Sequence, residues 1–236
     1  MGTSYGTIVK VEDLFYNTPA RLKFLKSDLT EISHIVELIT SFSLCWNNVS
    51  FSLIVKGKEI IKTNGNNSLL EENIKIIFGK DLSEHLSKID YKNDYGKVEG
   101  IITKPSYSRL DRNKQFIFVN NRYVKINFLS KILEEIYSDL LPSNRHPLLV
   151  IKLYIPSYEL DVNAHPTKKE VRFHQQSKVY DLIYYGILNS LYSCNYKTEN
   201  ENKSLEENYS TNFKDINKIE EVYKKNKKWL SGNYKF

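Results

Sequence analysis

Two lysines in the segment DVNAHPTKKEVRF, at residues 161–173, stand where they could meet an anion. Apolar residues alternate with polar ones on both sides of the centre, which predicts a hairpin whose loop carries Lys168 and Lys169. Pro166 fixes one backbone angle and stiffens that loop. A stiff loop holds the compact charge of a lysine in one place. The alternative is an edge hairpin whose lysines only discourage pairing with other strands.

Two further segments are specific enough to compare with known families. Residues 6–26 read GTIVKVEDLFYNTPARLKFLK, and residues 118–124 read FVNNRYV. With residues 161–173 they resemble the motifs GT-x-V-x-V-x-DLFYNTPAR-x-KFL, FVNGR-x-V and DVNVHP-x-K-x-EVRF of the bacterial MutL family of DNA mismatch repair proteins, in the same order. Asn121 replaces a glycine of the family pattern, and asparagine tolerates the positive φ angle that such a turn needs.

The resemblance implies an α+β fold with three parts. Residues 1–64 would form the C-terminal edge of a gyrase/Hsp90-type ATPase domain, and residues 65–194 a transducer domain with a ribosomal-protein-like, left-handed βαβ crossover, an exception to the usual handedness. Residues 195–236 are polar and predict a disordered, linker-like tail with a short helix near 219–229. The family's catalytic glutamate, magnesium-binding asparagine and glycine-rich lid lie upstream of the Gly-Thr segment, and no Asp-x-Gly-x-Gly pattern occurs here. We therefore expect a fragment that lacks most of the ATPase domain and does not hydrolyse ATP alone.

The resemblance also assigns site residues. In the family, the lysine that matches Lys168 reaches the γ-phosphate of ATP, where an ammonium group stabilises the charge that develops during hydrolysis. Thr7 matches a threonine near the nucleotide, although an ordinary threonine at a strand start is an equal alternative. The implied cofactor is ATP with magnesium in the complete protein, and none for this chain alone. No histidine or cysteine spacing predicts a metal site.

A basic cluster lies between the second and third motifs. Because lysine and arginine bind phosphates without reading bases, such a cluster suits a protein that tracks DNA of any sequence. The alternative is a solvated loop in a chain made basic by an AT-rich genome. The predicted DNA-binding residues are Arg109, Arg112, Lys114, Arg122 and Lys125.

The composition of the chain limits the classes of function that it can have. The net charge of +6 and the pI near 9.0 suit a nucleic-acid partner without establishing one. No apolar run is long enough for a membrane span, and no apolar leader predicts export, so a cytoplasmic, nucleoid-associated protein is expected. Expected partners are double-stranded DNA, a mismatch-recognition protein of the MutS type and a second copy bound through segments missing here. The predicted function is an ATP-controlled DNA clamp in mismatch repair; the alternatives are a non-enzymatic DNA-binding module and an inert product of a truncated gene.

Periodicity predicts the elements that would position these residues. Strands are expected at residues 7–11, 49–55, 59–63, 96–103, 115–119 and 148–155, the last in a central position. Helices are expected from Pro19 and at residues 30–44, 127–141 and 177–193, with a further helix that ends at Gly79. Residues 13–17 predict a buried turn, Lys56–Gly57 a turn between two strands, and Asn120–Asn121 a tight hairpin turn.

Overall fold

We analysed a computed structural model of the chain. It describes residues 5–65, 69–138, 140–142, 144–161 and 171–199, with side chains to residue 193. The chain divides into two compact units, which are Met1–Ile187 and Leu188–Phe236. The predicted boundary near residue 64 stays a prediction, and both predicted domains fall largely within the first unit. Of the second unit only the end of one helix is described. Residues 195–199 of the predicted tail continue this helix, and the rest of the predicted tail lies outside the described residues.

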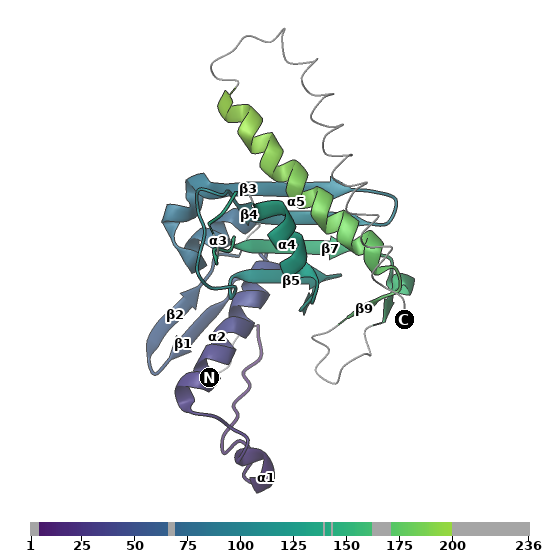
Figure 1. Cartoon of the computed structure of the whole chain (residues 1–236). Helices are drawn as coiled ribbons and strands as arrows, with labels where there is room; N and C mark the ends of the chain where they lie inside the picture. The colour runs from purple at the N-terminus through teal and green to yellow at the C-terminus, as the bar shows by residue number, and fades with distance from the viewer. Residues whose placement is uncertain (1–4, 66–68, 139, 143, 162–170, 200–236) are drawn as a thin grey trace. The chain divides into compact units, whose positions relative to one another are not determined.

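A five-stranded sheet with the order β3-β4-β7-β5-β6 forms the centre of the first unit (Figure 1). Its strands are β3 (Leu86–Lys92), β4 (Lys97–Thr103), β5 (Gln115–Val119), β6 (Arg122–Val124) and β7 (Leu149–Tyr154). Neighbouring strands are antiparallel except β5 and β7, which are parallel. The chain passes from β5 through β6 and the helix α4 (Leu129–Tyr137) to β7. This is the expected βαβ arrangement, and its handedness stays a prediction.

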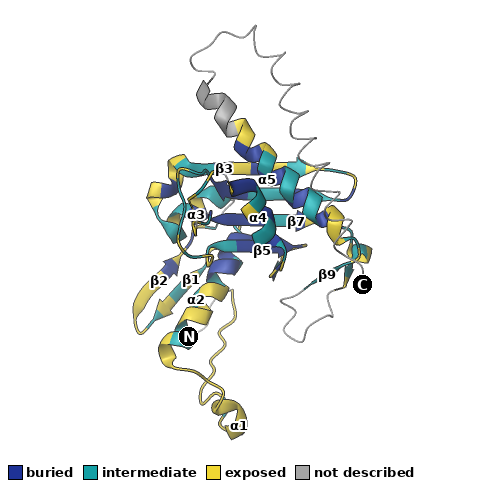
Figure 2. Ribbon diagram, viewed as in Figure 1, coloured by how far each residue is buried: buried dark blue, intermediate teal, exposed yellow. Residues whose placement is uncertain are grey.

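Helices lie on both faces of the sheet. Figure 1 shows α4 and the part of α5 (Gln176–Glu199) that belongs to the first unit on one face. The opposite face packs on α2 (Asp28–Cys45) and α3 (Leu70–Phe78), where a buried cluster joins Leu44 and Ile74 to Phe116, Phe118 and Val150. The central strand β7 is apolar on both faces because helices cover both, as its continuous apolar run predicted. Figure 2 shows this buried centre in dark blue.

Tight turns fall where residue types allow positive φ. Asn120 and Asn121 have φ angles of 47° and 64° and join β5 to β6. Lys56 and Gly57, with φ angles of 49° and 78°, join the antiparallel strands β1 (Ser52–Val55) and β2 (Lys58–Lys62). Gly79 caps α3 with a φ of 117°. These predictions are confirmed, including that of Asn121 at a position that favours glycine.

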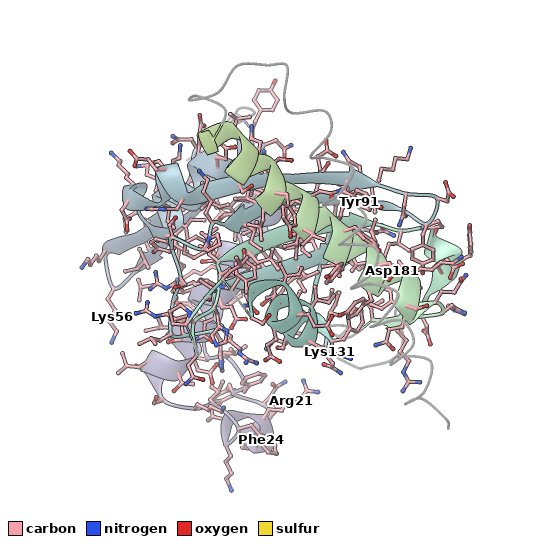
Figure 3. All side chains as sticks on the ribbon, turned by 45° about the horizontal axis from the view of Figure 1, so that its top comes forward. Arg21, Phe24, Lys56, Tyr91, Lys131 and Asp181 are labelled. Atoms are coloured by element: carbon pink, nitrogen blue, oxygen red, sulfur yellow. The ribbon has the colours of Figure 1, made fainter. Side chains whose placement is uncertain are left out.

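The first 26 residues differ from expectation. Residues 7–11 form no strand and are exposed, because an alternating pattern makes a strand only where a second strand supplies hydrogen bonds. The turn at 13–17 is present, with a hydrogen bond from Tyr16 N to Asp13 O, but Tyr16 is 86% exposed rather than buried. The helix α1 (Pro19–Leu22) begins as predicted, although Thr18 makes no side-chain cap. Figure 3 labels Arg21 and Phe24 beside this helix.

Other differences are local. Leu140, expected on the buried face of a longer helix, is 46% exposed because α4 ends at Tyr137. The strand β3 and the two short 3-10 helices at Lys80–His85 and Ser157–Glu159 were not predicted. Among the described residues, no helix is both long and apolar enough to cross a membrane. Within the same residues, no group of histidine, cysteine, aspartate or glutamate side chains is arranged to hold a metal ion.

Candidate nucleic-acid interface

A groove of about 660 Å³ lies between α2 and the β5–β6 hairpin. Arg112, Lys114 and Lys125 all line it, so the fold brings together three of the five predicted DNA-binding residues. Arg112 and Lys114 come from the loop before β5, and Lys125 directly follows β6. Because β5 and β6 pair through a two-residue turn, the residues flanking the hairpin come close in space.

Neighbouring side chains orient the two cations from the loop. The guanidinium group of Arg112 donates hydrogen bonds to Glu134 Oε1 at 3.1 Å, Ser130 Oγ at 3.2 Å and His146 Nε2 at 3.2 Å. The ammonium group of Lys114 lies 4.9 Å from the centroid of the Phe78 ring. Both charges are therefore held at the groove, whereas a lysine on a solvated loop would sample many positions.

The other two predicted residues do not line this groove. Arg109 is bound locally, since its guanidinium group contacts Tyr107 Oη at 3.1 Å and Asp111 Oδ2 at 3.5 Å. Arg122 pairs with Val119 across the hairpin. It is exposed and, unlike Tyr123 and Val124 of the same strand, does not line the groove.

Polar side chains that the sequence analysis did not select complete the groove. Asn113 lies between Arg112 and Lys114, and Asn127 lies two residues after Lys125; both line the groove, and their amide groups can donate to phosphate oxygens. Glu37 from α2 also lines the groove and accepts a hydrogen bond from Tyr123 Oη at 3.1 Å. Burial, and then the charge and hydrogen bond of Glu37, raise the pKa of Tyr123, so this phenol stays a neutral donor. In the sequence, the one signal that could have identified these two asparagines is their position near lysine or arginine residues.

The predicted nucleotide contacts are less fully described. Thr7 is exposed, and Lys168 and Lys169 lie outside the described residues. The base of the lysine loop is present, since β8 (Leu160–Asp161) pairs with β9 (Arg172–Phe173) as the predicted hairpin requires. One hydroxyl supplies one donor and two acceptor lone pairs, so a nucleotide would need further groups besides Thr7.

A hydrogen-bond network supports the base of that loop. Glu159 accepts from Gln175 Nε2 at 2.8 Å and from Tyr95 Oη at 3.4 Å, and its carbonyl oxygen accepts from His174 N at 3.0 Å. Burial, followed by the carboxylate of Glu159, raises the pKa of Tyr95 to about 12. The chain on each side of the loop is therefore bound to the turn between β3 and β4, which contains Tyr95.

Comparison with known proteins adds independent findings. The family model described as DNA mismatch repair protein, C-terminal domain, matches residues 74–192. The DNA mismatch repair protein MutL of Halothermothrix orenii is 41% identical over 186 residues, which cover 79% of this chain and 29% of that protein. MutL of Rickettsia bellii is 40% identical over 190 residues, which cover 79% and 31%. The chain thus spans less than a third of the length of these relatives.

Solved structures agree with this assignment. A crystal structure of the N-terminal domain of a DNA repair protein matches with a TM-score of 0.63 and 26% identity, over 76% of this chain and 59% of that one. The Aquifex aeolicus MutL ATPase domain with a K252N mutation matches with a TM-score of 0.50 and 20% identity, over 74% and 58%, and shows the fold alone. The family model covers half of the chain, and its description agrees with the relatives and with the motifs at residues 6–26, 118–124 and 161–173. The chain belongs to the MutL family of DNA mismatch repair proteins.

Proposed function

We propose that this chain serves DNA mismatch repair as the DNA-contacting part of a MutL-type, ATP-controlled clamp. The observation that carries the proposal is the groove that collects Arg112, Lys114 and Lys125 from separate segments. Cations of this kind displace counterions from the DNA backbone and bind any sequence. Binding without sequence preference is what a repair clamp needs, because a mismatch can occur anywhere.

The proposed partners follow from the family. They are double-stranded DNA and a mismatch-recognition protein of the MutS type, in the cytoplasm and near the nucleoid. ATP with magnesium is the proposed cofactor of the whole protein, and Lys168 is the proposed contact to its γ-phosphate. ATP supplies the free energy and the signal for clamp closure when bound. The contribution of this chain would be the lysine loop, whose base is held by the Glu159 network.

The test is a salt titration of duplex binding by the full chain, followed by fluorescence anisotropy. The groove variant combines Arg112→Gln, Lys114→Gln and Lys125→Gln. Each lost phosphate contact should reduce the slope of log K against log salt by about 0.9. The expected result is weaker binding and a flatter slope than for the parent, with unchanged preference among duplex sequences.

A matched control removes the same charge elsewhere. Lys56, Lys58 and Lys92 are exposed and do not line the groove, so their combined change to glutamine alters net charge by the same amount. This control should bind nearly as the parent does. Equal losses in both triple variants would mean that total charge, and not the groove, governs binding, and the proposal would fail. Circular dichroism of each variant shows whether the fold is intact.

A further inference from the structure

We infer that the DNA path continues past Arg112 into a second hollow, where Arg145 and His146 bind a further backbone phosphate. This inference rests on the proposed DNA binding and extends it to residues that neither the motifs nor the basic cluster selected. The second hollow has a volume of about 300 Å³ and lies between α4 and the start of β7.

The two hollows adjoin each other. Arg112, Gln115 and Ser130 line both of them. A chain of cations therefore begins at Lys114 and Lys125, passes through Arg112 and ends at Arg145. A phosphate backbone presents a regular row of charges, so a continuous row of cations is the surface that suits it.

The loop that carries Arg145 is held in place by the loop that carries Arg109. The backbone of Arg109 and that of His146 exchange two hydrogen bonds, at 2.8 Å and 2.7 Å. Arg145 Nη1 donates to the carbonyl oxygen of Ser108 at 3.1 Å. These contacts position the guanidinium group of Arg145 while its remaining N–H donors can meet a phosphate. Arg145 itself is exposed, so a ligand can reach it.

The charges in the second hollow favour an anion. Among the described residues, its lining holds the two cations Arg112 and Arg145 and the carboxylate of Glu134. Glu134 is already paired with Arg112. Because Arg112 Nε donates to His146 Nε2, the neutral imidazole carries its proton on Nδ1, which leaves that N–H as a donor. A phosphate bound here would receive hydrogen bonds from an arginine fork and from an imidazole, a charge-assisted set of donors.

Three single variants test this hollow in the same salt titration. Arg145→Gln removes one cation, and Asn144→Asp adds one negative charge to the lining with almost no change of shape. Asn144 has a φ of 63°, which aspartate also tolerates. We expect Arg145→Gln to reduce the salt slope by about 0.9 and to weaken binding to all duplexes alike. Asn144→Asp should weaken binding too, whereas Arg145→Lys should keep the slope.

The control is Lys92→Gln, which removes one exposed charge from β3, the opposite edge strand of the sheet from β6. Its salt slope should match that of the parent. If Arg145→Gln and Asn144→Asp bind as the parent does while the groove variant loses affinity, the second hollow is not a phosphate site and only the proposed function stands. If the folded parent binds no duplex at low salt, both proposals are overturned.

Discussion

The phenol of Tyr123 in β6 donates a hydrogen bond of 3.1 Å to Glu37 Oε1 in α2, and the two residues are 86 positions apart in the chain. The Tyr123 ring packs against Phe116 and Phe118, with centroid distances of 5.9 Å and 5.8 Å. One side chain thus joins the helix that lies before the predicted boundary to the sheet that follows it. The same contact forms one wall of the basic groove.

Replacing Tyr123 by phenylalanine should therefore lower the free energy of unfolding by about 1 kcal/mol, the usual contribution of such a hydrogen bond when one partner is partly exposed. The ring contacts remain, so the loss reports the hydroxyl alone. Urea denaturation measures it. Tyr158→Phe is the matched control, because Tyr158 is 79% exposed. If Tyr123→Phe is as stable as the control variant, the hydrogen bond between Tyr123 and Glu37 contributes nothing to stability.

Gly100 should not tolerate alanine. It lies in β4 at a φ of 152°, and an added Cβ would overlap the carbonyl oxygen of Val150 and lie 2.8 Å from Ile151 Cα in the adjacent β7. Backbone atoms of a central strand cannot move aside. We therefore expect Gly100→Ala to lower the free energy of unfolding by about 3 kcal/mol or more, or to give no soluble protein.

Gly57→Ala separates the two causes of the lost stability at Gly100, which are the positive φ and the overlap of the added Cβ with β7. Gly57 also has a positive φ, but nothing lies within 4 Å of its added Cβ. This variant should lose only about 1 kcal/mol from backbone strain. Similar losses in both variants would show that φ, and not the close approach of β4 and β7, makes Gly100 necessary.

The free energy of unfolding should decrease at acidic pH, in part because of His146. Burial, and then the charge of Arg112, lower the pKa of His146 below its usual 6.5, although Glu134 and Asp111 act in the opposite direction. The unfolded chain therefore takes up this proton first as the pH falls. The stabilisation is complete above the unfolded pKa and is lost as the pH drops through the lowered folded value.

The measurement is the unfolding free energy of the parent and of His146→Gln between about pH 7.5 and about pH 5, a range that brackets the unperturbed imidazole pKa. Glutamine can still accept a hydrogen bond from Arg112 through its amide oxygen but does not titrate. The parent should lose more stability than the variant. If the unfolding free energies of the parent and of His146→Gln change in parallel with pH, protonation of His146 does not contribute to the loss of stability.

Lys168 and Lys169 provide a matched pair for the nucleotide proposal. In an assembly of this chain with the remaining part of a MutL N-terminal domain, Lys168→Met should lower ATP turnover on the order of 100-fold, because a charge aimed at the transition state is lost. Nucleotide affinity should change far less. Lys169→Met should stay near the parent. Equal losses at both positions, or none at either, would assign the γ-phosphate contact to another group.

The sequence by itself determined the features that depend on a few adjacent residues. Asn120–Asn121, Lys56–Gly57 and Gly79 were predicted as turns or caps because few residue types accept positive φ. The helix α4 was predictable because its apolar residues recur at helical spacing, which matches burial of one face. The strand β7 was predictable because its apolar run is nearly continuous, which matches burial of both faces. Family membership followed from three motifs, since each combines rare neighbours in a set order.

Only the tertiary structure decided which residues meet. Arg112, Lys114 and Lys125 share a groove that the exposed Arg122 does not line, because strand pairing and not sequence distance decides which side chains meet. Arg145 is held beside the loop of Arg109 by the backbone bridge between Arg109 and His146 and by its own hydrogen bond to the carbonyl oxygen of Ser108. The pattern at residues 7–11 predicted a strand that does not form, since alternation describes a face and pairing needs a second strand to supply the hydrogen bonds.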